Sequence, residues 1–265
     1  MPKLKLRALA VASMSVCLAF AASPVAAGVA TKEGFAFPRE KEAKIIMFRP
    51  DVQVGTLRTG GVDEANADWT TLARGNMQTA FETAAEAREA KISFMGEPDG
   101  ENAKQLNDFR ALFQVVSTEA MNHGLFNDRL ATKKIPPAVQ GGAAKMKFDW
   151  TLGQDARKLK EITGADYAMF VYTHDAYGST GRKVAQLMMA GLFGAYIAPG
   201  VHLGYAGMVD LETGDLVWLN ADIAMGGDLR EKDGAEKRVK ELLRAFPKRD
   251  SPPAPAIEDK ASKKG

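Results

Sequence analysis

The side chains most able to do chemistry gather in one short stretch, "YTHDAYGSTGRKV", from Tyr172 to Val184. An apolar run precedes this stretch and another follows it, so we expect it to connect a central strand to a helix. Ligands of α/β sheets commonly bind at the carboxyl ends of strands, which makes the stretch a candidate for binding a partner. The candidate residues are His174, Asp175, Tyr177, Ser179, Arg182 and Lys183.

The glycines of this stretch do not match a phosphate-binding loop. A Walker A loop needs four residues between its glycines, followed by Lys and then Ser or Thr, so that backbone amides and a hydroxyl surround the phosphates and their metal. Here two residues separate Gly178 from Gly181, and Val184 follows Lys183. A dinucleotide fingerprint would need a third glycine at the correct step, which is missing. We therefore expect no nucleotide cofactor.

The serine does not match a nucleophile turn either. Such a turn has glycine two residues before the serine, whereas Tyr177 occupies that position before Ser179. His174 and Asp175 are neighbours in sequence, and neighbouring side chains of an extended segment point to opposite faces. The spacing predicts no catalytic residues, although a periplasmic hydrolase with an atypical site near His174, Asp175 and Ser179 stays open as an alternative.

Metal binding is not indicated by the histidines or by the cysteine. His123, His174 and His202 are far apart in sequence and none forms a paired zinc motif. Cys17 is the only cysteine and lies near the N-terminus. We expect no metal, no disulfide and no cofactor.

The first 27 residues are typical of a secretory signal peptide. Lys3, Lys5 and Arg7 precede an apolar run, and small residues up to Ala27 mark a cleavage site. The position of Cys17 inside the apolar run does not suit lipid attachment. We therefore predict a periplasmic protein that is exported and cleaved near Ala27.

The charge balance argues against nucleic acid as a partner. The chain has 35 basic and 33 acidic residues, and removing the leader with its three basic residues leaves 32 against 33. A nearly neutral chain has no general electrostatic attraction to nucleic acid. The end of the chain, residues 248–265, combines prolines with Lys, Ser and Gly, so we predict a disordered tail after a single domain at 36–247.

Strand and helix patterns alternate along this domain. We expect strands at 44–48, in "KISFM" and at 167–172, and helices at about 69–90, 103–122, 154–163 and 230–246. "GYAGMVDLETGDLVWLNADI" reads as two strands around a tight turn, which is a hairpin pattern. The expected fold is α/β, with a mixed β-sheet, a C-terminal antiparallel hairpin and helices packed on the sheet.

The segment from Val184 to Ile197, "VAQLMMAGLFGAYI", is apolar nearly all round. Such a helix is expected to be buried against the sheet. A surface that meets a membrane or another subunit is the alternative, because a small domain cannot easily cover so continuous an apolar segment. As a helix the segment is too short to span a bilayer.

Three segments carry a resemblance to a known group: "AKIIMFRPDV", "FDWTLGQDARKLKEITGADYAMFVY" and "YAGMVDLETGDLVWLN". They resemble exported envelope proteins related to the curli-secretion component CsgG, the penicillin-binding-protein activator LpoB and the N-terminal domain of TolB. The resemblance implies an α/β domain that acts by assembling with envelope proteins and carries no catalytic residues. The lipoprotein members have a lipid-attachment cysteine that this chain lacks, and the apolar segment does not alternate as a pore strand would.

These observations lead to one expected function with two rivals. We expect a non-enzymatic periplasmic protein that acts by protein–protein binding in envelope assembly or secretion, through sheet-edge or helix surfaces near 173–205. The partner would be an envelope protein or a second copy of the chain. The rivals are the hydrolase described above and a membrane-associated oligomer with peripheral membrane contact through 184–197.

Overall fold

The structure is a computed structural model that describes residues 27–86, 91–125, 134–135, 145–193, 198 and 200–255. The expected signal peptide, apart from Ala27, lies outside the described residues. So do the end of the apolar segment, at 194–197, and the last part of the expected tail, at 256–265.

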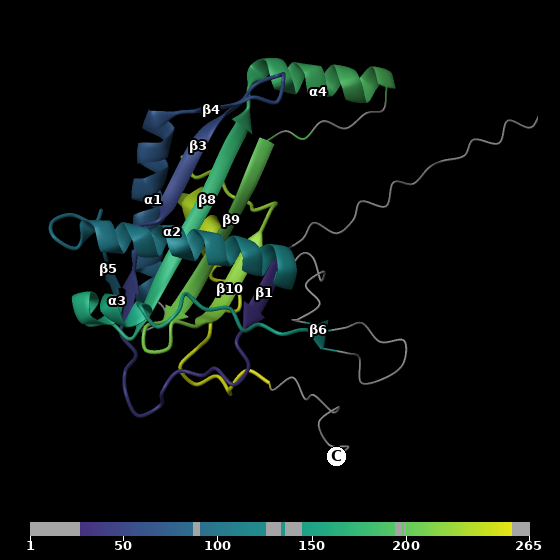
Figure 1. Ribbon diagram of the computed structural model, residues 1–265. Coiled ribbons are helices and arrows are strands. Elements are labelled where there is room, and N and C mark those ends of the chain that lie inside the picture. The colour runs from purple at the N-terminus through teal and green to yellow at the C-terminus, as the bar shows by residue number, and fades with distance from the viewer. Residues whose placement is uncertain are drawn as a thin grey trace, which may run out of the picture.

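Within the described residues, eight strands form one mixed sheet (Figure 1). Its main path runs in the order β1-β10-β9-β8-β2-β5, and β3 pairs with β8 and with β4. The strands are β1 (Ala27–Thr31), β2 (Ile45–Met47), β3 (Asp51–Leu57), β4 (Asp63–Ala65), β5 (Ile92–Phe94), β8 (Tyr167–Gly178), β9 (Gly200–Asp210) and β10 (Leu216–Asp222). β6 (Lys134–Ile135) and β7 (Lys145–Met146) form a separate pair.

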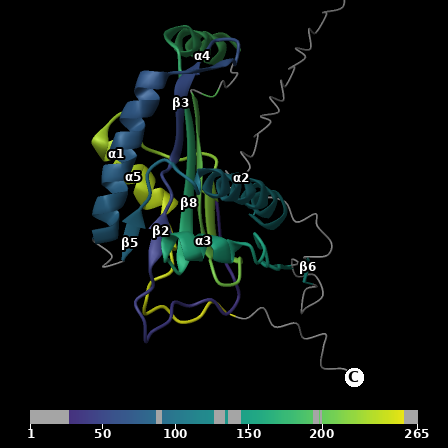
Figure 2. The ribbon, with the colours of Figure 1, turned by 60° about the vertical axis from the view of Figure 1, so that its left-hand side comes forward.

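Helices cover both faces of the sheet (Figures 1 and 2). Their bounds are α1 (Ala67–Glu86), α2 (Ala103–Ala120), α3 (Ala156–Thr163), α4 (Thr180–Phe193) and α5 (Lys232–Leu242), and a π-helical turn, η1 (Met121–Leu125), extends α2. The inward side chains of α1 and α5 share one core with Trp218 and Met169. Those of α2 and α3 share the other with Phe170 and Leu219. The expected fold class, a mixed α/β sheet covered by helices, is confirmed.

The C-terminal hairpin is the element that the sequence predicts best. β9 and β10 pair antiparallel around the turn at Leu211–Asp215. Gly214 has φ of +78°, and a Cβ there would lie 2.0 Å from the carbonyl oxygen of Gly153. The glycine is therefore needed both for the backbone conformation and for the close approach of the 151–153 segment. The hairpin is confirmed.

β8 is much longer than the strand expected at 167–172. It continues to Gly178 because both of its edges are paired over that length, with β3 from Tyr172 to Gly178 and with β9 from Tyr167 to Tyr177. The polar stretch expected to be a connection is thus the second half of the central strand, and only Ser179 separates it from α4. That expectation was wrong because the polar side chains of this half have partners on each face of the sheet.

β2 and β3 follow one another along the same edge of β8. β2 pairs with Tyr167–Met169 and β3 with Tyr172–Gly178, both in parallel. Pro50 lies between them and has no N–H to give to the ladder, so the pairing is interrupted there. The sequence pattern stops the first strand at this proline and does not indicate that β3 resumes beyond it.

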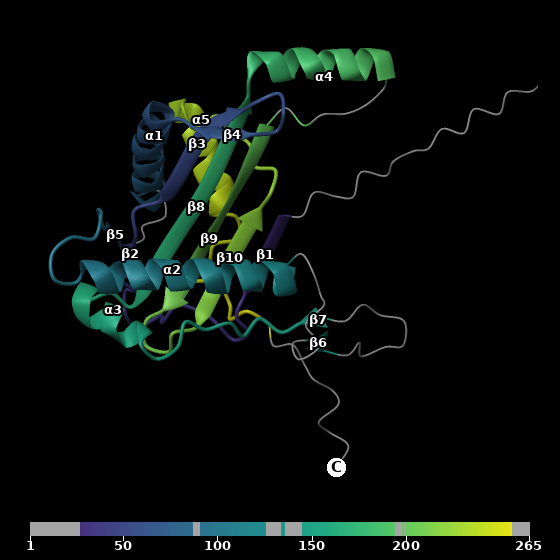
Figure 3. The same cartoon turned by 45° about the horizontal axis from the view of Figure 1, so that its top comes forward.

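α4 is not buried against the sheet. It lies across the end of β8, beyond the body of the sheet (Figures 1 and 3). Leu187 is 75% exposed and Leu192 is 69% exposed. The expectation that this apolar helix packs on the sheet was wrong, because the strand leads directly into the helix and directs it past the sheet's end. The alternative interpretation of this segment, a surface that meets a membrane or another subunit, is therefore kept.

Both ends of the described chain lie against the body. β1 begins at Ala27, before residue 36 where the body was expected to begin, and pairs with β10. Near the other end, Ala254 donates its N–H to the carbonyl oxygen of Phe35 at 3.0 Å, and Gly34 donates to the carbonyl of Ala254 at 3.0 Å. The first part of the expected tail is therefore attached to the segment that follows β1.

Candidate functional site

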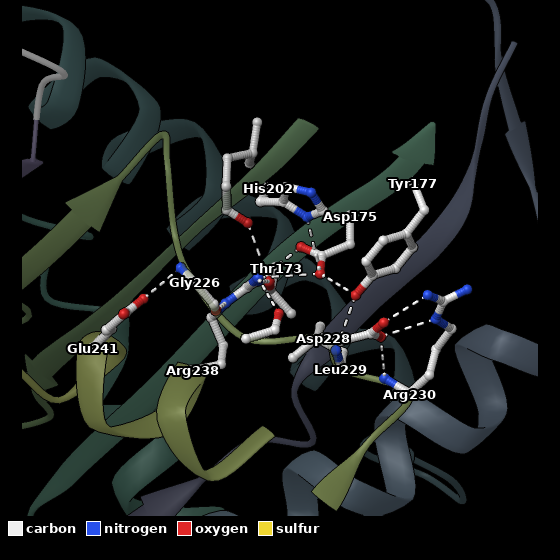
Figure 4. A network of polar contacts seen from close by, with 12 residues as sticks. Thr173, Asp175, Tyr177, His202, Gly226, Asp228, Leu229, Arg230, Arg238 and Glu241 are labelled. Atoms are coloured by element: carbon white, nitrogen blue, oxygen red, sulfur yellow. Dashed lines mark hydrogen bonds and ion pairs between the residues drawn. The ribbon is translucent and has the colours of Figure 1, made fainter. Parts of the chain in front are cut away.

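Asp175 forms a buried ion pair with Arg238 of α5 (Figure 4). Both side chains are fully buried, and Arg238 donates through Nη1 and Nη2 to the two carboxylate oxygens at 2.8 and 3.1 Å. Arg238 also donates to Thr173 Oγ1 and, through Nε, to the carbonyl oxygen of Gly226 at 2.9 Å. These bonds satisfy both charges and join β8 to α5 and to the segment before it.

Tyr177 extends this network toward the surface. Its hydroxyl donates to Asp175 Oδ2 at 2.8 Å and accepts the backbone N–H of Leu229 at 2.9 Å. The guanidinium of Arg230 lies 3.9 Å from the centre of the Tyr177 ring and 4.6 Å from the ring of Trp69. A cation held between two aromatic rings stabilises their packing, so Arg230 joins α1 to the central strand.

The electrostatics of the network keep its acids ionised. Burial alone would raise the pKa of Asp175, but the imidazole of His202 and the guanidinium of Arg238 outweigh burial and hold that pKa below its ordinary value. Hydrogen bonds from Arg230 lower the pKa of Asp228 to about 2. Burial, with Asp175 beside it, raises the pKa of the Tyr177 hydroxyl. The carboxylates therefore act as fixed acceptors at neutral pH.

His174 lies on the opposite face of the sheet from Asp175, as the alternation of a strand requires. Its Nε2 is 2.7 Å from Asp63 Oδ2 of β4. Ser179 faces neither group, because its hydroxyl accepts the backbone N–H of Arg182 at 3.2 Å and so caps the start of α4. The three residues of the hydrolase alternative do not form a relay, and the geometry gives that alternative no support.

Arg182 and Lys183 lie at the start of α4. Arg182 donates through Nε to the carbonyl oxygen of Ala198 at 2.9 Å and through Nη1 to that of Arg58 at 3.3 Å. It thereby fixes the helix to the segment before β9 and to the β3–β4 connection. Lys183 is exposed. Of the six candidate residues, Asp175 is fully buried and paired with Arg238, and the other five are at least partly exposed.

Arg238, Thr173 and His202 complete the network, and none of them was a candidate from the sequence. Arg238 shares the inward face of α5 with Ala235, Val239 and Leu242. An arginine in the apolar positions of an amphipathic helix signals a buried partner, because a buried charge must be paired. That signal was present in the sequence, but the position of its partner was not.

A second charged cluster lies around a cavity of about 120 Å³ beside Tyr167. Lys41 donates to Asp166 at 2.9 Å and Lys160 to Glu212 at 2.9 Å, so its charges pair with one another. Within the part of the chain that the structure describes, no group of three or more His, Cys, Asp or Glu residues is placed to hold a metal ion.

β1 is an edge strand of the sheet. Across the described residues its only strand partner is β10. Lys32, which follows β1, donates its N–H to the carbonyl of Val217 at 2.9 Å, and this fixes which residues of the antiparallel ladder point inward. By the same register, Gly28 and Ala30 bond to β10, whereas the N–H and C=O groups of Val29 and Thr31 point away from the sheet.

The fold and these surfaces define a mixed α/β domain with an open sheet edge and a projecting apolar helix. None of the helices in the described part of the chain is long and apolar enough to cross a membrane.

No family model matches the chain, and no curated protein matches it. Among solved structures, the chain is similar to the PelC dodecamer from Paraburkholderia phytofirmans, with 9% identity and a TM-score of 0.32 over 81% of this chain and 95% of that one. It is also similar to lipoprotein GNA1162 from Neisseria meningitidis, with 16% identity and a TM-score of 0.26 over 68% of this chain and 79% of that one. Similarity at this level assigns neither a family nor an activity.

Proposed function

We propose that this protein is a non-enzymatic component of the cell envelope that acts by protein–protein binding in envelope assembly or secretion. The signal-peptide pattern supports an exported, periplasmic location. The use of Asp175 and Tyr177 in a closed internal network supports a structural role for the polar residues of β8. The partner is an envelope protein; the alternative partner is a second copy of the chain.

The observation that carries the proposal is the open edge of β1. Exposed edge strands pair readily with strands of other proteins, and proteins usually protect them with charged residues or proline. β1 has the sequence "AGVAT", which contains neither. Its outward N–H and C=O groups can therefore pair with an extended segment of a partner, which would add a strand to the sheet.

The test is to block this edge without disturbing the sheet. The Val29 N–H points away from β10, so Val29→Pro removes an outward donor and leaves the bonds of Gly28 and Ala30 to β10 in place. Val29→Ala is the matched control, because both substitutions remove the contact that the Val29 side chain makes with the core. The measurement is crosslinking and pulldown of the exported protein from envelopes, with the captured proteins compared among the three forms.

We expect wild type and Val29→Ala to capture the same protein and Val29→Pro to lose it. Thermal unfolding of Val29→Pro alongside Val29→Ala checks that the fold is kept. Equal capture by all three forms would contradict binding at β1. Turnover of a cell-wall or phosphate substrate by the wild type would contradict the non-enzymatic function.

A further inference from the structure

Exposed apolar side chains concentrate at one end of the molecule. Nine large hydrophobic residues of the described chain are exposed, and five of them lie in α4 or in the β3–β4 connection that Arg182 joins to it: Val62, Val184, Leu187, Met188 and Leu192. The four in α4 follow steps of three, one and four residues, so they form one stripe along the helix. This stripe with Val62 is called the α4 surface below.

The α4 surface is too small to be a stable protein interface by itself. Val184, Leu187, Met188 and Leu192 are 53%, 75%, 56% and 69% exposed. These fractions leave on the order of 400 Å² of apolar helix surface, about half of the ~800 Å² that each partner buries in a stable complex. A second copy pairing through α4 alone would therefore associate weakly. A bilayer does not have this limit, because lipid surrounds each side chain that enters it.

The charges around α4 favour a negatively charged surface. Arg182 and Lys183 lie at its base. The carboxylates of Asp63 and Glu64, which follow Val62, contact His174 and Arg58 instead of these two basic residues. Between Asp175 and Asp210 the sequence has no acidic residue at all. Basic residues next to an apolar helix stripe are the pattern of helices that lie in the interface of membranes containing anionic lipid.

The orientation of α4 suits this contact. In Figures 1 and 3 the helix lies across the end of β8 and extends beyond the sheet, with the body on one side of it. The Ser179 cap and the bonds from Arg182 to the carbonyls of Ala198 and Arg58 fix its direction relative to the sheet. The helix can therefore lie flat on a surface while the sheet extends away from that surface.

We propose that α4 is an interfacial helix that docks this protein on the surface of a bilayer containing anionic lipid headgroups. Its apolar stripe enters the boundary between headgroups and acyl chains, and Arg182 and Lys183 lie at the level of the phosphates. This contact is separate from the protein binding proposed at β1, because it uses different residues. It would place the open β1 edge at a fixed orientation relative to the membrane.

The test compares one triple variant and one double variant of the exported, purified protein with the wild type. Leu187→Gln, Met188→Gln and Leu192→Gln together replace three of the four apolar side chains of the stripe, and Gln keeps helix propensity. Leu112→Gln with Val115→Gln is the matched control, because these residues are 38% and 62% exposed on α2, away from α4. Sedimentation is measured with vesicles of phosphatidylethanolamine and phosphatidylglycerol, and with vesicles of phosphatidylcholine alone.

We expect wild type and the α2 variant to sediment with the phosphatidylglycerol vesicles and less with phosphatidylcholine. The α4 variant should bind at least ~tenfold more weakly, since three apolar side chains no longer enter the bilayer. Equal binding by the α4 variant, or no binding by the wild type, would overturn the proposal. It would also be overturned if the wild type, without lipid, formed an oligomer that the α4 substitutions dissociate, because the occupant would then be a second copy.

Discussion

At the residue scale, the ion pair between Asp175 and Arg238 gives the polar half of β8 a structural role, because it joins this strand to α5. Each charge is fully buried, and each is the main partner of the other. A buried charge that loses its partner is costly, because water cannot replace the lost interaction. The pair therefore holds α5 on the sheet and makes each residue intolerant of substitution by itself.

We predict that Asp175→Ala lowers the free energy of unfolding by about 3–5 kcal/mol, because it leaves the guanidinium of Arg238 buried and unpaired. Urea unfolding followed by circular dichroism measures this loss. The double variant Asp175→Ala with Arg238→Met should recover part of it, since no unpaired charge remains. A loss below about 1 kcal/mol for the single variant would show that the pair does not stabilise the fold.

The same network predicts the dependence of stability on pH. Asp175 and Asp228 both have a lowered pKa in the folded protein, and that of Asp228 is about 2 against an ordinary value of 3.8. A lowered folded pKa stabilises the protein above the unfolded pKa, and this contribution is lost as the pH falls through the folded pKa. Stability should therefore fall between about pH 4 and pH 2.

Asp175→Asn should make the fall of stability with acid shallower, because one of the two groups that titrate is gone while Asp228 remains. The measurement is the urea midpoint at a series of pH values for wild type and variant. An identical slope in both proteins would mean that Asp175 does not carry the dependence.

Tyr177 gives a smaller prediction from the same network. Tyr177→Phe keeps the ring that faces Arg230 but removes the hydroxyl that accepts from Leu229 and donates to Asp175. We expect a loss of about 1–3 kcal/mol in unfolding free energy, because a buried donor and a buried acceptor each lose a partner. Thermal and urea unfolding measure it, and Trp69→Phe serves as a control for the aromatic contact alone.

At the scale of elements, α4 behaves differently from the helices that cover the sheet. Because Leu187, Met188 and Leu192 are exposed, their substitution by Gln should change the unfolding free energy by no more than about 0.5 kcal/mol each. Phe113→Ala on α2 should cost about 3–5 kcal/mol, because that side chain is 2% exposed and stacks on Phe170. A large destabilisation by the α4 substitutions would mean that the helix is part of a core.

The elements also show how far the sequence can be followed. The hairpin and the helices α1, α2, α3 and α5 were predictable, because an amphipathic period or a tight turn is a local property of the chain. The second half of β8 was not, because its polar side chains are satisfied by Arg238 and Asp63, which lie far away in sequence. α4 was misjudged for a related reason: apolar composition favours burial but does not give the direction in which the preceding strand sends the helix.

For the whole molecule, the alternation of strands and helices was enough to predict a mixed sheet with a terminal hairpin. It was not enough to predict the edges of that sheet. β1 lies next to the expected cleavage site, in a segment of small residues with no clear strand period, and its pairing with β10 depends on contacts nearly two hundred residues apart. The sequence therefore predicted a polar connection as the candidate site, whereas the structure offers the open edge of β1 and the projecting helix α4.

The central claim is that the outer edge of β1 binds a strand of another protein, and amide hydrogen exchange at Val29 and Thr31 tests it most directly. Their N–H groups point away from β10, so they should exchange rapidly in the purified protein, whereas those of Ala30 and Lys32 should be protected by their bonds to β10. In the complex captured from envelopes, we predict that Val29 and Thr31 become protected as well. Unchanged rapid exchange at both residues in that complex would contradict the account.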